Sequence, residues 1–328
     1  MEKNKFWFEE LKNTVTKRFE EKGVTQRDAE FLGQYFATVD FYGVHSHGVK
    51  TLDAHLKRIE RGGYNLSPKF ETKKETAAFS VIDGDNAIGM LSANHCINYA
   101  MGKAKETGMF SVFSFNNNTY GAAFYYALEA AKRGFICITS SNSPAQMAAV
   151  GGKEKLLGTN PFSCAFPSKE NHPIVIDMAT STVAKSKLNE YKQKGLPIPE
   201  GWALDSEGQP TTDADKAMEG LMLPMAGFKG YGISMMIDII SGVLSGAAFL
   251  DNVGRFYNPE NNAMNVGFNF TIIDPRVVYG EGFYTQMDEY INTIRNSTPI
   301  EGKTIALPGD DRLVAYQNNL KDGCLVQL

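Results

Sequence analysis

From about residue 76 onward, short apolar runs typical of β-strands alternate with stretches of helical periodicity. The strand-like runs are AAFSVIDG, MFSVFSFN and FICITSSN, with further candidates in FSCAFP, PIVIDM and FNFTIID. Between the first three lie MLSANHCINYAMGKAKETG and GAAFYYALEAAKRG, which have the apolar spacing of helices and end in glycine. This alternation predicts an α/β region in which helices cover a largely buried sheet.

The first 75 residues have a different pattern, which is mainly helical. Apolar residues recur at helical spacing from Phe8 to Phe19, and Gly23 offers a stop. Thr25 then opens a second helix with the capping sequence TQRD. Single hydrophobic cores stop growing at roughly 250–300 residues, so we expect a chain of 328 residues to form two lobes.

Composition excludes several classes of function. The net charge is −4 and no block of basic residues offers a nucleic-acid footprint. The longest apolar run, 233–250, contains Asp238 and two glycines, which favours a buried helix within 230–248 over a membrane span. The stretch 189–215 is rich in Pro, Gly and polar residues and is interpreted as a loop or lid.

The cysteines indicate where the protein works. Cys96, Cys137, Cys164 and Cys324 are widely separated and form no CxxC pair. Scattered cysteines in a chain of this length favour a reducing compartment, so we expect a cytoplasmic protein. Because the longest apolar run is better explained as a buried helix than as a membrane span, we expect no membrane partner.

The segment DFYGVHSHGVKTLDAHLKRIERGG, residues 40–63, contains three of the five histidines. If a helix begins near Ser46 or His47, one polar face carries His47, Thr51, His55 and Arg58. The opposite face is then apolar, with Val49, Leu52, Leu56 and Ile59.

Three interpretations of this histidine face remain open at this point. It is a solvated polar face, a metal site, or the position of a general acid/base. A metal site needs three or four converging ligands, and neither an HExxH motif nor a carboxylate cluster supports one, so we predict no metal. An imidazole with a pKa near 6.5 gives and takes protons at neutral pH.

This segment resembles the Ser-His-Gly segment of the malate/L-lactate dehydrogenase family of NAD(P)H-dependent oxidoreductases. That family includes ureidoglycolate and sulfolactate dehydrogenases, diketogulonate reductases and cyclic imino acid reductases. The resemblance extends over VIDGDNAIGMLSA, GGKEKLLGTNPFSCAFP, VIDMATSTVAKSK, PEGWALDSEGQPTTD, GFKGYGISMMIDIISGVLSG and ALPGDDR. The family uses a non-Rossmann fold, and the chain indeed has no GxGxxG fingerprint.

The resemblance implies an α/β cofactor-binding domain, residues 76–299, with a mixed sheet covered by helices. It also implies a smaller, mainly helical domain, residues 1–75, which carries the Ser-His-Gly motif and is joined by part of the C-terminal end, about 300–328. Members work as homodimers or dimers of dimers on small-molecule substrates. We therefore expect the protein to be a cytoplasmic, homodimeric dehydrogenase or reductase that acts on CH–OH groups.

The same resemblance identifies three cofactor-binding segments: VIDMATS, GFKG and PGDD. In the first, small residues and backbone amides after an apolar strand suit a nucleotide. In the second, Lys229 offers a charge at a helix N-terminus, and in the third, Asp310 and Asp311 disfavour a 2′-phosphate. This favours NAD, as NADH, over NADP. The predicted cofactor residues are Ser143, Asp177, Met178, Ala179, Thr180, Ser181, Lys187, Phe228, Lys229, Gly309, Asp310 and Asp311.

The chain departs from the family pattern at Thr51, where the family usually has the arginine that binds the substrate carboxylate. It departs again at Thr119, in NNNTYG, where the family usually has a second histidine. Threonine supplies neither a positive charge nor a proton at neutral pH. His47 is then the remaining acid/base candidate, and Ser46 is expected to orient either its imidazole or the substrate oxygen.

These departures bear on the substrate. Arg58 or Lys50 is expected to replace the lost arginine, and His55 to add a hydrogen bond. The function predicted is interconversion of a 2-hydroxy acid and its 2-oxo acid. The alternatives are reduction of a cyclic imino acid or another atypical substrate, or a non-catalytic member that binds cofactor.

Overall fold

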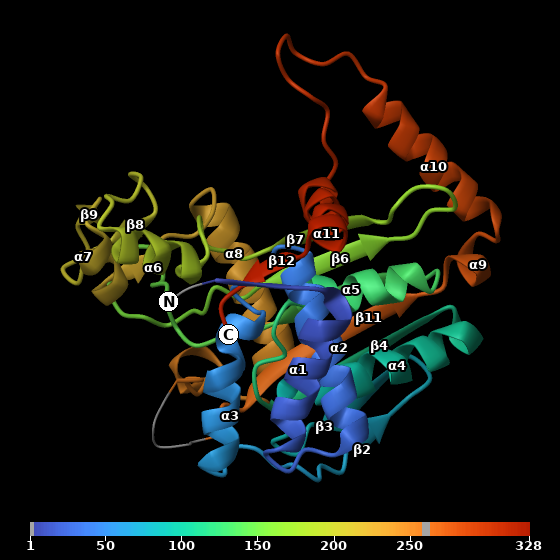
Figure 1. Ribbon diagram of the computed structural model, residues 1–328, viewed down its shortest axis with the longest axis horizontal. Helices are drawn as coiled ribbons and strands as arrows, with labels where there is room; N and C mark the ends of the chain where they lie inside the picture. Colours follow the sequence, from blue (N-terminus) through green and yellow to red (C-terminus); the bar gives the residue numbers. More distant parts are fainter. Residues whose placement is uncertain (1–2, 258–262) are drawn as a thin grey trace.

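A computed structural model of the chain describes residues 3–257 and 263–328. Its largest unit is a seven-stranded sheet of order β2-β3-β4-β11-β5-β6-β7 (Figure 1). The strands are β2 (Glu71–Glu75), β3 (Phe79–Asp83), β4 (Met109–Asn117), β5 (Ile136–Ser141), β6 (Phe162–Phe166), β7 (Ile174–Met178) and β11 (Val266–Ile273). The β3–β4 pair is parallel and the other pairs are antiparallel, so the predicted mixed sheet is confirmed.

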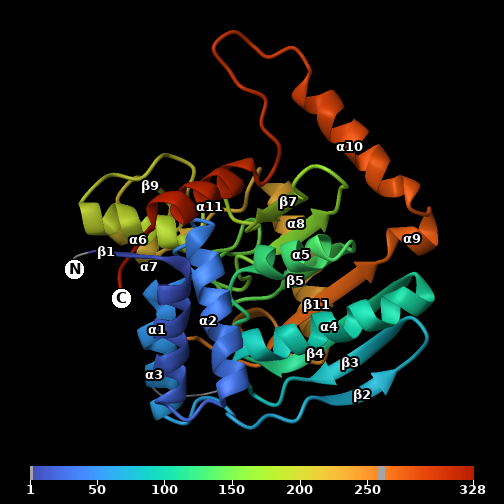
Figure 2. The same cartoon turned by 45° about the vertical axis from the view of Figure 1, so that its right-hand side comes forward.

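Strand β11 is the centre of the sheet, although it comes late in the sequence. It inserts between β4 and β5, and its side chains Phe268, Phe270 and Ile272 are fully buried. Helices α4 (Gly89–Thr107) and α5 (Ala123–Lys132) pack on one face of the sheet (Figure 2). The other face is covered by α8 (Phe228–Asp238) and the π-helical turn η2 (Ile239–Val243).

The N-terminal region is helical, as predicted. It contains α1 (Phe8–Glu20), α2 (Gln26–Phe41), the short 3-10 helix η1 (Val49–Thr51) and α3 (Leu52–Glu60). The Thr25 hydroxyl accepts a hydrogen bond from the Asp28 amide, which confirms the N-cap of α2. The chain ends join here, because β1 (Asn4–Phe6) pairs with β12 (Cys324–Val326) and α11 (Asp310–Asp322) packs against α2.

The stretch interpreted as a loop, 189–215, is folded, and that interpretation is wrong. It contains the end of α6 (Lys185–Lys194), then β8 (Ala203–Leu204), β9 (Pro210–Thr211) and the start of α7 (Ala214–Glu219); β10 (Leu221–Met222) completes a small sheet. These elements share a core that includes Leu188, Ile198, Ala203, Ala217 and Met222. The unit is so small that its few apolar residues stand singly among polar ones, and no periodicity marks it.

The prediction of a single buried helix over 230–248 is also wrong. Helix α8 ends at Asp238, and the π-helical turn that follows carries apolar side chains into solvent. Met236, Ile239, Val243 and Leu244 are each at least half exposed. A sequence that is apolar all round reads as buried, yet only one side of this segment meets the sheet.

The remaining elements are η3 (Leu250–Asn252), α9 (Pro275–Val278) and α10 (Gly282–Arg295). Helix α10 and the chain that follows it project from the body of the molecule in both orientations (Figures 1 and 2). Within the described ranges, no helix combines the length and the apolarity needed to cross a bilayer.

Gly267 marks the closest approach between η2 and the sheet, because a Cβ there would lie 1.6 Å from the Ser241 carbonyl oxygen. We expect Gly267→Ala to lower the free energy of unfolding by about 1–3 kcal/mol. Gly102→Ala is the control, since this residue lies in α4 with no described atom within 4 Å of the added Cβ, and it should gain about 0.5–1 kcal/mol. Urea unfolding measures both; equal effects would contradict the close contact.

Candidate active site

Asp40, near the C-terminal end of α2, organises the Ser-His-Gly turn. Its carboxylate is 1% exposed, accepts the Val49 amide at 2.7 Å and accepts His45 Nδ1–H at 2.7 Å. The start supposed near Ser46 or His47 is too early: the 3-10 helix η1 begins at Val49 and α3 follows at Leu52. The first amide of η1 is satisfied by an acid from the preceding helix, which local sequence does not reveal.

Position 48 must be glycine because the Asp40 carboxylate leaves no room for a side chain there. A Cβ at this position would lie 2.3 Å from the Asp40 carboxylate atoms. The turn therefore separates the two neighbouring histidines: His45 pairs with Asp40, while His47 lines a cavity.

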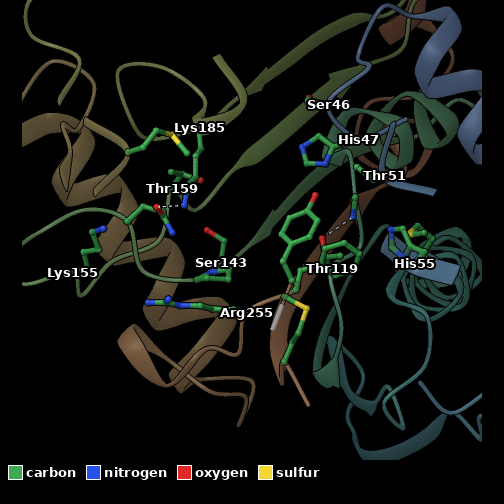
Figure 3. Close-up of a pocket in the computed structure, with 18 of the residues that line it drawn as sticks. Ser46, His47, Thr51, His55, Thr119, Ser143, Lys155, Thr159, Lys185 and Arg255 are labelled. Atoms are coloured by element: carbon green, nitrogen blue, oxygen red, sulfur yellow. Dashed lines mark hydrogen bonds between the residues drawn. The ribbon is translucent and has the colours of Figure 1, made fainter. Parts of the chain in front are cut away.

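The cavity has a volume of about 770 Å³ and two facing walls (Figure 3). The histidine wall, as we call it, consists of Ser46, His47, Thr51, His55 and Thr119. The wall across the cavity includes Ser143, Thr159, Lys155, Lys185 and Arg255. The structure thus brings the Ser-His-Gly segment together with Thr119 and Ser143, as predicted from separate parts of the sequence.

His47 is exposed and faces the cavity. Partial desolvation by the surrounding protein lowers the pKa of its imidazole below 6.5, and the charge of Asp177 opposes this shift while that of Arg312 adds to it. Asp177, in β7, forms an ion pair of 2.8 Å with Arg312 in α11. His47 is therefore neutral at pH 7 and lies within electrostatic range of the end of β7.

His55 is also kept neutral. It is 4% exposed, and its Nδ1 lies 2.7 Å from the Tyr64 hydroxyl. Burial, then the charges of Arg58 and His47, lower its pKa to about 3. The histidine wall carries no positive charge at neutral pH.

Arg58 does not replace the missing substrate-binding arginine, contrary to our expectation. Its side chain is 3% exposed and outside the cavity lining. The guanidinium donates to Asn118 Oδ1 at 3.0 Å and to the Phe256 carbonyl at 3.5 Å. Sequence spacing placed Arg58 on the face of His55, but this end of α3 is covered by other segments. Lys50 is exposed and also lies outside the lining.

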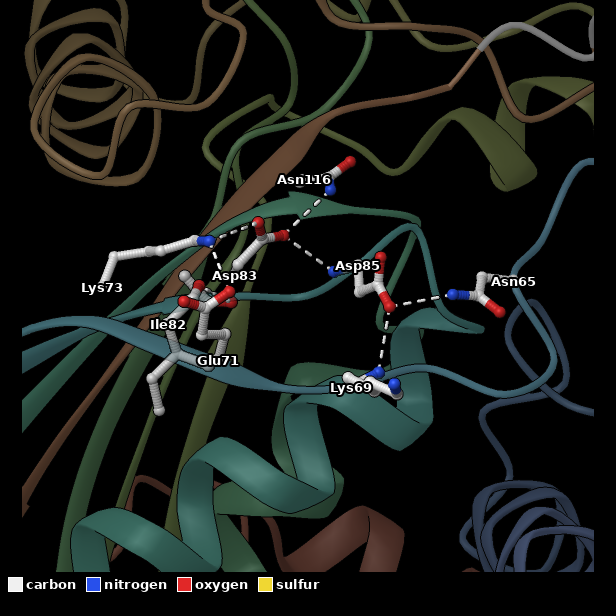
Figure 4. Close-up of polar contacts among 9 residues, drawn as sticks. Asn65, Lys69, Glu71, Lys73, Ile82, Asp83, Asp85 and Asn116 are labelled. Carbon is white, nitrogen blue, oxygen red and sulfur yellow. Dashed lines mark hydrogen bonds and ion pairs between the residues drawn. The ribbon is translucent and has the colours of Figure 1, made fainter.

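A polar network holds the chain that leads to Thr119 (Figure 4). Asp83 Oδ1 accepts the Asp85 amide and the Asn116 side-chain amide, each at 2.9 Å, which ties the ends of β3 and β4 together. Asn118 Nδ2 donates to the Ala87 carbonyl at 2.9 Å. Thr119 is thereby fixed opposite the cationic side of the cavity.

The three segments predicted to bind cofactor meet at β7. The Thr180 carbonyl accepts the Met225 amide at 2.9 Å, which joins the first segment to the turn before α8. The Val175 amide donates to the Pro308 carbonyl at 3.2 Å, which brings in the third segment. The ion pair between Asp177 in β7 and Arg312 in α11 also links the first segment to the third.

The individual side chains in these segments differ in their availability. Thr180 and Ser181 hydroxyls donate to backbone carbonyls of Thr159 and Val183. Ion pairs join Lys187 to Glu190 and Asp310 to Arg295. Phe228, Lys229, Met178 and Asp311 are exposed, Ala179 and Gly309 partly so.

The arrangement fits a nicotinamide cofactor. Helix α8 has an N-terminus preceded by Gly227 in the left-handed region, with φ of 61°, and Lys229 stands exposed in its first turn. Exposed helix N–H groups next to a lysine suit a pyrophosphate. Among residues 3–257 and 263–328 we find no group of three His, Cys, Asp or Glu side chains placed to hold a metal ion.

A sequence profile of the malate/L-lactate dehydrogenase family matches residues 6–327. The chain belongs to this family. A malate dehydrogenase of Pyrococcus horikoshii is 38% identical over 311 residues, covering 92% of this chain and 85% of that protein. The solved structure of the sulfolactate dehydrogenase from Methanocaldococcus jannaschii superposes with a TM-score of 0.92 at 34% identity, covering 99% of this chain and 93% of that one.

A further relative is named for its cofactor. The ureidoglycolate dehydrogenase (NAD(+)) of Escherichia coli is 30% identical over 317 residues, covering 96% of this chain and 90% of that protein. Membership confirms the resemblance, the α/β fold of the non-Rossmann type and an NAD(P)-dependent oxidoreductase acting on CH–OH groups, as predicted.

Sequence reasoning missed Lys155, Lys185 and Arg255, the cations of the cavity. They come from three separate segments. Lys155 and Lys185 lie inside GGKEKLLGTNPFSCAFP and VIDMATSTVAKSK, two segments that carry the family resemblance, but neither lysine was predicted as a site residue. Arg255 had no sequence signal.

The buried His55 makes stability depend on pH. Its pKa is 6.5 when unfolded and about 3 when folded, so the unfolded state binds the extra proton between these values. Stability is therefore complete above pH 6.5 and is lost as pH falls toward 3, by up to about 1.4 kcal/mol per pH unit. We expect His55→Phe to flatten this slope in urea titrations at several pH values.

Tyr64→Phe is the matched control, because it removes the same hydrogen bond without removing a titrating imidazole. It should keep the wild-type slope. A His55→Phe slope equal to that of the wild type would contradict the buried neutral state of His55.

Proposed function

We propose that the chain interconverts a 2-hydroxy acid and its 2-oxo acid with His47 as proton donor and acceptor. The observation that carries this proposal is the position of His47, which opens into the cavity within electrostatic range of Asp177 in β7. The predicted cofactor segments meet at that strand. The four cysteines are unpaired, which is consistent with a cytoplasmic enzyme.

The bound cofactor supplies or takes the hydride. His47 holds the proton that accompanies it: the neutral imidazole accepts the proton of the substrate hydroxyl, and its protonated form donates to the oxo oxygen in the reverse direction. Ser46, Thr51 and Thr119 line the same wall and offer hydroxyls that orient the substrate oxygens. The low pKa of His47 favours its role as base at neutral pH.

NADH is the proposed cofactor form. Asp311 is exposed and unpaired with any cation within the part of the chain that the structure describes, so it disfavours a 2′-phosphate. Asp310 contributes less, because Arg295 neutralises it.

His47→Ala should lower kcat by about 10²–10⁴-fold, because the proton donor and acceptor is lost. The affinity for NADH, measured by quenching of protein fluorescence, should stay unchanged. In the wild type, the rate of 2-oxo acid reduction should rise as pH falls through the His47 pKa, which lies below 6.5. The variant should lose this dependence. Undiminished turnover in His47→Ala would refute the assignment.

We further propose a homodimer that uses the exposed side of α8 and η2. This side carries Met236, Ile239, Val243 and Leu244, exposed by 50–60%. Large exposed apolar patches mark protein interfaces, and a second copy of the chain presents the same patch for an isologous contact.

Val243→Asp should convert the dimer to a monomer in light scattering after size-exclusion chromatography, because a carboxylate is costly in an apolar interface. Leu196→Asp is the control: Leu196 is 49% exposed but lies in the segment between α6 and β8. A monomeric wild type, or a dimeric Val243→Asp, contradicts this interface.

A further inference from the structure

Three cationic side chains converge on the cavity from three segments. Lys155 precedes Thr159, Lys185 begins α6, and Arg255 follows η3. Figure 3 shows them on the wall that faces His47, Thr51 and Thr119. All three line the same cavity, and their charges act on one another: burial, then Lys155 and Arg255, lower the pKa of Lys185. Burial, then Arg255, likewise lower that of Lys155.

Little negative charge from the protein balances these cations: the charge of Glu219 raises the pKa of Lys155 against burial and Arg255. Lys155 Nζ donates to the Glu219 carbonyl at 2.8 Å, and Lys185 Nζ donates to Gln146 Oε1 at 2.7 Å. Both partners are uncharged acceptors. Within residues 3–257 and 263–328, none of the three cations forms an ion pair, and no Asp or Glu lines the cavity.

Holding three like charges together is costly unless an anion balances them. The histidine wall does not supply one, because its side chains are neutral at pH 7. A single substrate carboxylate leaves most of this positive charge uncompensated. A second acidic group on the substrate would remove the repulsion and gain charge-assisted hydrogen bonds.

We propose that Lys155, Lys185 and Arg255 form a subsite for an oxyanion, and that this oxyanion is the distal acidic group of a dianionic 2-oxo acid. The inference rests on the proposed function and names its substrate class: a 2-oxo acid with a second carboxylate or a sulfonate. The charge that Thr51 lacks on the histidine wall is supplied across the cavity. A cofactor phosphate is the other source of an oxyanion here, and the test separates the two.

The test compares oxaloacetate, a dianion, with pyruvate, a monoanion of the same reaction class. Arg255→Met and Lys185→Met should each raise the KM for oxaloacetate about tenfold or more and leave that for pyruvate within a few-fold, since one charged hydrogen bond is lost. Lys153→Met is the matched control, because Lys153 is exposed on the same loop as Lys155 but outside the lining. Lys185→Arg, which keeps the charge, should restore the oxaloacetate KM.

The cofactor arm measures the Kd of NADH and NADPH for each variant by fluorescence quenching. Unchanged values support the substrate subsite. If a variant binds NADH or NADPH more weakly and the ratio of its KM for oxaloacetate to its KM for pyruvate is unchanged, the cations bind a cofactor phosphate and the proposal is overturned.

A third arm does not depend on turnover. Calorimetry of wild type and Arg255→Met with L-malate and L-lactate, in the presence of NAD⁺, should show tighter binding of L-malate, lost selectively in the variant. If the wild type binds L-malate and L-lactate with equal affinity, the subsite proposal is overturned. The proposed function still holds in that case, provided that both 2-oxo acids are reduced. Selective malate binding without any turnover retains the subsite and refutes the proposed reaction.

Discussion

The site depends on one buried carboxylate, that of Asp40. A buried charge is stable only when its acceptors are satisfied, and Asp40 meets this condition with the Val49 amide and His45 Nδ1–H. Its volume leaves room only for glycine at position 48. Because the carboxylate fixes both the turn and the start of the next helix, His47 is directed into the cavity while His45 is held away from it.

The sheet gathers the rest of the site. Strand β11, which comes late in the sequence, joins the two halves of the sheet between β4 and β5. Strand β7 lies at the edge of the sheet, where segments from three regions meet. Antiparallel neighbours and close loop contacts perform here the positioning that a glycine-rich turn performs in the common dinucleotide fold. This explains how a chain without the GxGxxG fingerprint builds a nicotinamide site.

The cavity divides its chemistry between its walls. Desolvation lowers the pKa of both the cavity-facing His47 and the buried His55 and keeps them neutral, so that wall suits proton transfer. The facing wall concentrates positive charge that no carboxylate of the described lining balances. Neutral threonines at positions 51 and 119 are consistent with this division, because the cationic side chains that we propose to bind the anion lie on the other side.

The sequence by itself determined the family, the alternation of strands and helices, the capped start of α2 and the candidate residues His47, Thr51 and Thr119, since these signals are local or recur as motifs. The tertiary structure alone decided where η1 begins, ahead of α3, because the amide of its first residue, Val49, donates to Asp40 in another helix. It turned Arg58 away from the cavity and exposed one side of α8, since burial depends on which segments cover a face. It also assembled Lys155, Lys185 and Arg255, because convergence of distant residues leaves no periodicity or spacing in a single chain.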